Sequence, residues 1–203
     1  MSGAGNHRYV MSELSIDYER LASSLGAWPD PTALGAALLD ALAARYVSSH
    51  PASALREFRQ SGATYLFDLA SPAGLPQEDR TVAAWTITPA AVGTRDKTYQ
   101  RGFPLAPRAD GSPVDRGHVV PHLSGGEFGP NIFRQDRALN RGWSEQGKRY
   151  RALEREAAST HGCFFFAHLI YTDDTAEPSQ IETGVLRGAV LHVERFDNRP
   201  ING

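Results

Sequence analysis

The spacing of apolar residues changes near position 60, and this change constrains the fold more than any other feature of the sequence. Before it, Tyr18, Leu21 and Leu25 follow the three- and four-residue spacing of an amphipathic helix. After it, the apolar segments are short, rich in β-branched and aromatic residues, and bounded by Gly or Pro. We therefore expect an α+β protein with a helical region over residues 1–60, followed by a strand-rich region over residues 61–203.

Local start signals place the expected helices. Asp30 is a typical N-cap residue and Pro31 suits the first helical position, so a helix is predicted from there to about Val47. Pro51 permits a short further helix that continues through Phe58.

The rest of the chain is expected to contain strands around one late helix. Ser144 is a predicted N-cap for a helix over residues 144–158. Strands are predicted at residues 64–69, 81–88, 114–121 and 163–171, with a hairpin at 181–186 and 189–196.

Composition narrows the class of protein. The chain has 203 residues, 41% of them hydrophobic, which is enough for one apolar core. Cys163 is the only cysteine, so an internal disulfide and a cysteine-rich zinc site are both excluded. No segment resembles a signal peptide or supplies the roughly 20 apolar residues of a membrane span. We expect a soluble protein without membrane contacts, either cytoplasmic or delivered to a target cell by a specialised secretion route.

Basic charge gathers in one segment. The chain carries a formal net charge of −2, but residues 115–155 contain eight basic and five acidic residues. Arginine pairs with phosphate oxygens in bidentate geometry, so this segment suits an enzyme that acts on a polyanion. A solvated helix face would explain the same charges about equally well.

The same segment holds the residue types that phosphodiester hydrolysis requires. The reaction needs a base that works near neutral pH, a hard cation on the phosphoryl oxygens, and positive charge for the transition state. Histidine, here His118, suits the first task, and an asparagine carbonyl suits Mg²⁺. Arg116, two positions before the histidine, can supply the third if the backbone aims it at the site.

These residues stand in an order that resembles a known family. The sequence Asp115-Arg116-Gly117-His118, followed by Asn131-Ile132-Phe133-Arg134-Gln135 and by Asn140-Arg141-Gly142, resembles the DNA/RNA non-specific endonucleases. Those enzymes belong to the His-Me finger, or ββα-metal, nucleases. The resemblance covers about residues 80–198 and is close over residues 114–155. It implies a ββα-metal core on a mainly antiparallel sheet, within an endonuclease domain of residues 61–203.

The resemblance also implies roles for five residues. His118 would be the general base, and Asn140 would be the one direct protein ligand of Mg²⁺, which Mn²⁺ can replace. Arg116 would stabilise charge in the transition state, and Asp115 would orient its neighbours. Asn131 would hold the loop of the catalytic histidine by hydrogen bonding.

Two features depart from the family pattern. The family places an acid about two helical turns after its metal-binding asparagine, where this chain has Lys148. Glu154 has the expected local surroundings but stands farther along the chain, and Glu145 competes with it for the role. Some relatives add an upstream arginine, for which Arg95 and Arg101 are both candidates.

Other interpretations remain open from the sequence. A catalytically silent nucleic-acid-binding module would keep the same scaffold, and a zinc hydrolase would have to use His118 with His122. A loop-positioning or surface role is favoured for His122 over a role as base or ligand. Core packing is favoured for Trp143 over stacking on a nucleobase.

The expected partners follow from the expected activity. The substrates would be DNA and RNA, and an immunity or regulatory protein is a possible partner because an unregulated nuclease is lethal to its host. This setting matches a bacterial toxin, an effector or a defence nuclease. The helical residues 1–60 lie outside the resemblance and are the candidate for partner docking or trafficking.

Overall fold

One antiparallel sheet forms the centre of the protein. The computed structural model describes residues 16–70, 78–92, 98, 105, 108 and 111–199. In this part of the chain the sheet has six strands in the order β1-β2-β3-β6-β7-β8, and every neighbouring pair is antiparallel. The strands are β1 (Ala54–Gln60), β2 (Ala63–Leu69), β3 (Arg80–Ile87), β6 (Phe164–Ile170), β7 (Gln180–Arg187) and β8 (Val190–Asp197). The prediction of an α+β protein with a mainly antiparallel sheet is confirmed.

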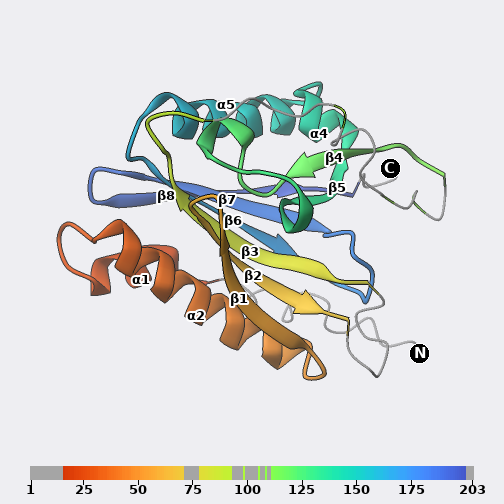
Figure 1. Ribbon diagram of the computed structural model, residues 1–203, viewed down its shortest axis with the longest axis horizontal. Coiled ribbons are helices and arrows are strands. Elements are labelled where there is room, and N and C mark those ends of the chain that lie inside the picture. Colours follow the sequence, from red (N-terminus) through yellow and green to blue (C-terminus); the bar gives the residue numbers. More distant parts are fainter. Residues whose placement is uncertain are drawn as a thin grey trace, which may run out of the picture.

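Helices cover both faces of this sheet (Figure 1). Helices α1 (Tyr18–Ser24) and α2 (Pro31–Ser49) lie on one face, where Tyr18 packs against Phe166 of β6. Helix α5 (Glu145–Ser159) lies on the other face, where Tyr150 meets Phe196 of β8 edge to face. No helix among the residues described is long and apolar enough to cross a membrane.

A small substructure lies on the α5 side of the sheet. Strands β4 (Val114–His118) and β5 (Ile132–Asp136) form a two-stranded antiparallel sheet of their own. The short helices η1 (His122–Ser124) and η2 (Gly129–Asn131) lie in the connection between them. Helix α4 (Arg137–Arg141) follows β5 directly, and the chain then enters α5.

Both predicted N-caps are confirmed. The Asp30 carboxylate accepts a hydrogen bond of 2.8 Å from the Ala33 backbone N–H, and Pro31 is the first residue of α2. The Ser144 hydroxyl accepts one of 3.0 Å from the Gly147 N–H at the start of α5. The strand predictions and the predicted hairpin of β7 and β8 are confirmed to within a few residues.

The helix predicted from Pro51 through Phe58 is wrong. Residues 54–60 form β1, which pairs along its whole length with β2. Ser61 and Gly62 both have positive φ values, 51° and 86°, and form the tight turn of the hairpin. Pairing with β2 satisfies the β1 backbone, so tertiary contact overrides the short apolar spacing that suggested a helix.

A buried carboxylate ties α1 to the sheet. Glu182 of β7 accepts hydrogen bonds from the Tyr18 hydroxyl, from His168 Nδ1 at 2.9 Å and from Arg195 Nε at 2.9 Å. Burial by itself raises the pKa of Glu182, but the bonds from His168, Tyr18 and Arg195 outweigh it and lower the pKa to about 2.

Glu182 should therefore make the folded protein sensitive to acid. Its pKa is lower in the folded than in the unfolded chain, so its contribution is complete above about pH 4.5 and is lost as the pH falls toward about 2. We expect Glu182→Gln to be less stable than wild type at pH 7 and to show a shallower stability loss over this pH range, measured by urea unfolding. Glu57→Gln, an exposed β1 control, should keep the wild-type pH dependence. Equal slopes for wild type and Glu182→Gln would contradict this role.

Candidate active site

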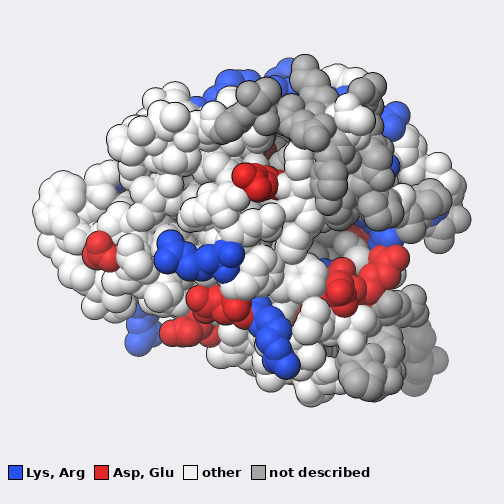
Figure 2. Space-filling model, viewed as in Figure 1, with Lys and Arg blue, Asp and Glu red and all other residues white. Residues whose placement is uncertain are grey.

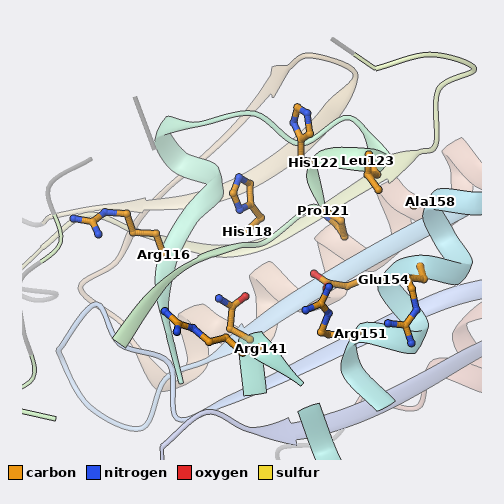
Figure 3. A pocket seen from close by; sticks show the side chains of 11 residues that line it. Arg116, His118, Pro121, His122, Leu123, Arg141, Arg151, Glu154 and Ala158 are labelled. Atoms are coloured by element: carbon orange, nitrogen blue, oxygen red, sulfur yellow. The ribbon is translucent and has the colours of Figure 1, made fainter. Parts of the chain in front are cut away.

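An open cleft of about 520 Å³ lies where β4, the loop after it, α4 and α5 meet. Figure 3 shows Arg116 and His118 on one side of this opening and Arg151 and Glu154, from α5, on the other. The polar residues that line the cleft are His118, His122, Arg116, Arg141, Arg151, Arg155, Asn140 and Glu154. The cleft thus brings together His118, Asn140, Arg116 and Glu154, four of the six site residues expected from the sequence.

His118 is the last residue of β4, directly opposite Ile132 of β5. Its side chain is only 8% exposed, and its ring packs against the Phe128 ring with centroids 5.9 Å apart. Strand pairing fixes the backbone and the aromatic contact limits rotation of the ring. The imidazole is therefore held in place at the wall of the cleft.

Asn131 fixes the chain as it leaves His118. This fully buried side chain accepts a 2.7 Å hydrogen bond from the Val120 N–H and donates a 3.0 Å bond to the Val120 carbonyl. It also donates to the Glu127 carbonyl at 2.7 Å, and its backbone carbonyl accepts from the Val119 N–H. These contacts fit the loop-holding role expected of Asn131, which does not itself line the cleft.

Gly126 allows the loop to pack closely against Asn131, whose hydrogen bonds to Val120 and Glu127 form what we call the Asn131 clamp. A Cβ atom at this position would lie 1.8 Å from the Val120 carbonyl oxygen and 2.7 Å from Asn131 Nδ2. No side chain fits there without displacing the backbone. The glycine is needed for this close packing within the loop.

The Asp115 carboxylate joins β4 to α4. It accepts hydrogen bonds from Arg137 Nε at 3.1 Å, from Asn140 Nδ2 at 3.0 Å, and from Arg141 Nε and Nη2 at 2.7 and 3.0 Å. Burial raises the pKa of Asp115, but the bonds from Arg141 and Asn140 outweigh burial and hold that pKa below its ordinary value. Asp115 is therefore an ionised positioning group behind the cleft.

This contact also orients the Asn140 amide. A carboxylate can only accept, so the NH₂ group of Asn140 must face Asp115. Because the amide is planar, its carbonyl oxygen points away from Asp115. Asn140 lines the cleft, so this oxygen is the hard donor that suits Mg²⁺.

Helices α4 and α5 meet in close contact. A Cβ atom at Gly147 would lie 2.5 Å from the Ala138 carbonyl oxygen and 2.9 Å from that of Leu139. The glycine that weakens the first turn of α5 is thus the point where α4 packs against it. This contact sets the position of Asn140 relative to the α5 residues of the cleft.

The α5 face decides which acid reaches the cleft. Glu154 lines it, whereas the Glu145 side chain is 83% exposed and pairs with Lys148. Arg151 also lines the cleft, and it stands three residues before Glu154 and four before Arg155, which are the spacings that place side chains on one side of a helix. From the sequence, both arginines are expected only as part of the basic charge of the segment, although the spacing of residues 151, 154, 155 and 158 marks one helix face.

Two further expectations can be compared with the structure, and a third cannot. The core position expected for Trp143 is wrong: its side chain is 64% exposed, because the left-handed turn at Gly142 carries the chain out of α4. His122 Nδ1 lies 3.3 Å from the Gly126 carbonyl, which fits a loop-positioning role, although the residue also lines the cleft. Arg95 and Arg101 lie outside the described residues.

The cleft is strongly cationic. Four arginines and one glutamate line it, and the Arg141 guanidinium is paired with Asp115. Figure 2 shows Lys and Arg side chains gathered along the upper edge of the molecule, above α5. Within the described ranges, no three His, Cys, Asp or Glu side chains group in a way that would hold a metal ion. An amide oxygen completed by water is a different kind of site from such a group.

No protein-family model matches the chain, and no curated protein was found to be similar to it. A function for this chain must therefore be inferred from the chemistry of the cleft itself.

The Asn131 clamp should contribute measurably to stability. Asn131→Ala leaves the Val120 N–H and carbonyl buried without their partners, so we expect the free energy of unfolding to fall by about 3 kcal/mol. Urea unfolding measures this loss, and faster amide hydrogen exchange at Val120 locates it. Gln60→Ala removes only a 3.4 Å bond to Phe128 in the same loop region and should cost less than about 0.5 kcal/mol. Similar losses for the two variants would show that Asn131 does not hold the loop.

Proposed function

We propose that the protein is a metal-dependent endonuclease of the His-Me finger, or ββα-metal, type, which hydrolyses phosphodiester bonds in DNA and RNA with little sequence preference. One observation carries this proposal. His118 at the end of β4 and Asn140 on α4 are distant in sequence but line the same arginine-rich cleft. A β-hairpin followed by helices, the order of β4, β5, α4 and α5, supports the proposed core.

His118 is the proposed general base. His118 lines the cleft, and its imidazole is held by strand pairing and by Phe128. A histidine base removes the proton of the attacking water as the phosphorus–oxygen bond forms. The Asn131 clamp keeps the following backbone rigid, so little reorganisation of the base is required.

Asn140 is the proposed protein ligand of the metal. Asp115 turns its carbonyl oxygen toward the cleft, and Glu154 supplies a carboxylate that can accept hydrogen bonds from water beside the cation. Bound Mg²⁺, or Mn²⁺ in its place, would supply positive charge to the phosphoryl and leaving oxygens.

The arginines supply the remaining charge. Arg116, Arg151 and Arg155 line the cleft and can pair with phosphate oxygens of the substrate and of the transition state. Phosphate contacts carry no sequence information, so a site built from them should cut with little sequence preference.

A catalytically silent binding module is the rival proposal. It needs the arginines, but it has no use for an oriented Asn140 oxygen or for a rigidly held His118 in the same cleft. It predicts salt-dependent nucleic-acid binding without product and without a response to metal. For biological setting, we propose a toxin, effector or defence nuclease with an immunity or regulatory partner, in which residues 1–60 contribute to docking or trafficking.

Plasmid nicking tests the proposal. We expect wild-type protein to cleave duplex DNA, single-stranded DNA and RNA when Mg²⁺ or Mn²⁺ is present. Cleavage should stop when a chelator is added. His118→Ala should lower the rate by at least about 100-fold because it removes the general base. Asn140→Ala should lower the rate and raise the Mg²⁺ concentration needed for half-maximal cleavage.

His192→Ala is the matched control, because His192 is exposed on β8 and does not line the cleft. It should cleave like wild type, and all variants should unfold at similar denaturant concentrations. Undiminished cleavage by His118→Ala would rule out this mechanism, and binding without cleavage in any metal would favour the silent module.

A further inference from the structure

Trp143 is a large aromatic side chain exposed beside the cleft. Its exposed fraction is 64%, whereas Trp85 is buried in the core and Trp28, 77% exposed, lies in the connection between α1 and α2 near the β7–β8 turn. Trp143 follows the last residue of α4 by two positions and precedes the Ser144 cap of α5. Both of these helices contribute residues to the cleft.

The indole is held in place on its inner side. The Trp143 backbone N–H donates a 2.9 Å hydrogen bond to the Ala138 carbonyl, and the Arg141 guanidinium carbon lies 5.0 Å from the centre of the Trp143 ring. Arg141 itself is fixed by two hydrogen bonds to Asp115, the same carboxylate that orients Asn140. One chain of contacts therefore links the proposed metal ligand to the exposed ring.

The bonds of Arg141 leave part of its guanidinium for another contact. Nε and Nη2 both face Asp115, and neither of those bonds uses Nη1. Arg141 also lines the cleft, so its guanidinium can pair with a phosphate oxygen there. A cation for the backbone and a flat ring for a base thus lie side by side, the pairing found in single-strand binding sites.

We propose that Trp143 stacks against an unpaired nucleobase next to the scissile phosphate, so that the protein prefers single-stranded DNA or RNA to duplex. This inference rests on the proposed endonuclease function. In a duplex both faces of each base are covered by its neighbours, and a base must leave the stack before it can pack on a protein ring. A single strand presents its bases without that cost.

Binding in chelator separates stacking from cleavage. A fluorescently labelled oligothymidylate and a duplex hairpin of equal length are each titrated with the folded full chain. We expect wild-type protein to bind the single strand more tightly than the duplex. Trp143→Ala should weaken single-strand binding on the order of tenfold and change duplex binding by less than about twofold, and Trp143→Phe should retain most of the affinity.

Trp28→Ala is the matched control, because it removes an equally exposed tryptophan away from the cleft and should change neither affinity. In Trp28→Phe the remaining tryptophans are Trp143 and the buried Trp85, so iodide quenching of tryptophan fluorescence reports on Trp143. Bound oligothymidylate should reduce this quenching. If bound oligothymidylate does not reduce iodide quenching in this variant, the stacking proposal is contradicted. Thermal unfolding of Trp143→Ala should match wild type, because the side chain is exposed.

The possible failures can be told apart. Equal weakening of both substrates by Trp143→Ala, or weakening of neither, overturns the stacking proposal, while metal-dependent cleavage by wild type would still support the endonuclease. A wild-type protein that neither binds nor cleaves nucleic acid overturns both.

Discussion

The proposed site depends on the hydrogen bonds that the Asp115 carboxylate accepts from α4. Asp115 lies on β4, three residues before His118, and it accepts hydrogen bonds from Arg137, Asn140 and Arg141 of α4. It thereby sets the distance between the strand that carries the proposed base and the helix that carries the proposed metal ligand. The same carboxylate fixes the guanidinium on which Trp143 packs. Its negative charge is paired with the guanidinium groups of Arg137 and Arg141.

The larger sheet supplies the rigid background for this contact. Tyr150 and Phe196 attach α5 to β8, and the close approach at Gly147 attaches α4 to α5. On the other side, the buried Asn131 amide pins the loop that follows His118. The elements that form the cleft are thus held in place by packing and hydrogen bonds outside it. A preorganised catalytic site requires such support.

Much of this arrangement could be predicted from the sequence, because it follows from local rules. The Asp30 and Ser144 caps and the β7–β8 hairpin depend on residues adjacent in the chain. Strand β1 could not be found in this way, because its stability comes from pairing with β2. To choose between Glu154 and Glu145, one must know which face of α5 is turned toward the cleft. To predict that Trp143 is exposed, one must know that the chain turns away from α4 at Gly142.

The central claim is that His118 and Asn140 act on one phosphate through one cation. A crystal structure of the protein soaked in Mn²⁺, with anomalous scattering to locate the ion, tests this most directly. We predict one Mn²⁺ in the cleft, bonded to Asn140 Oδ1 at about 2.1 Å and otherwise to water, with the His118 imidazole facing it. An ion bound elsewhere, or one held by a different set of side chains with His118 turned away, would contradict the account.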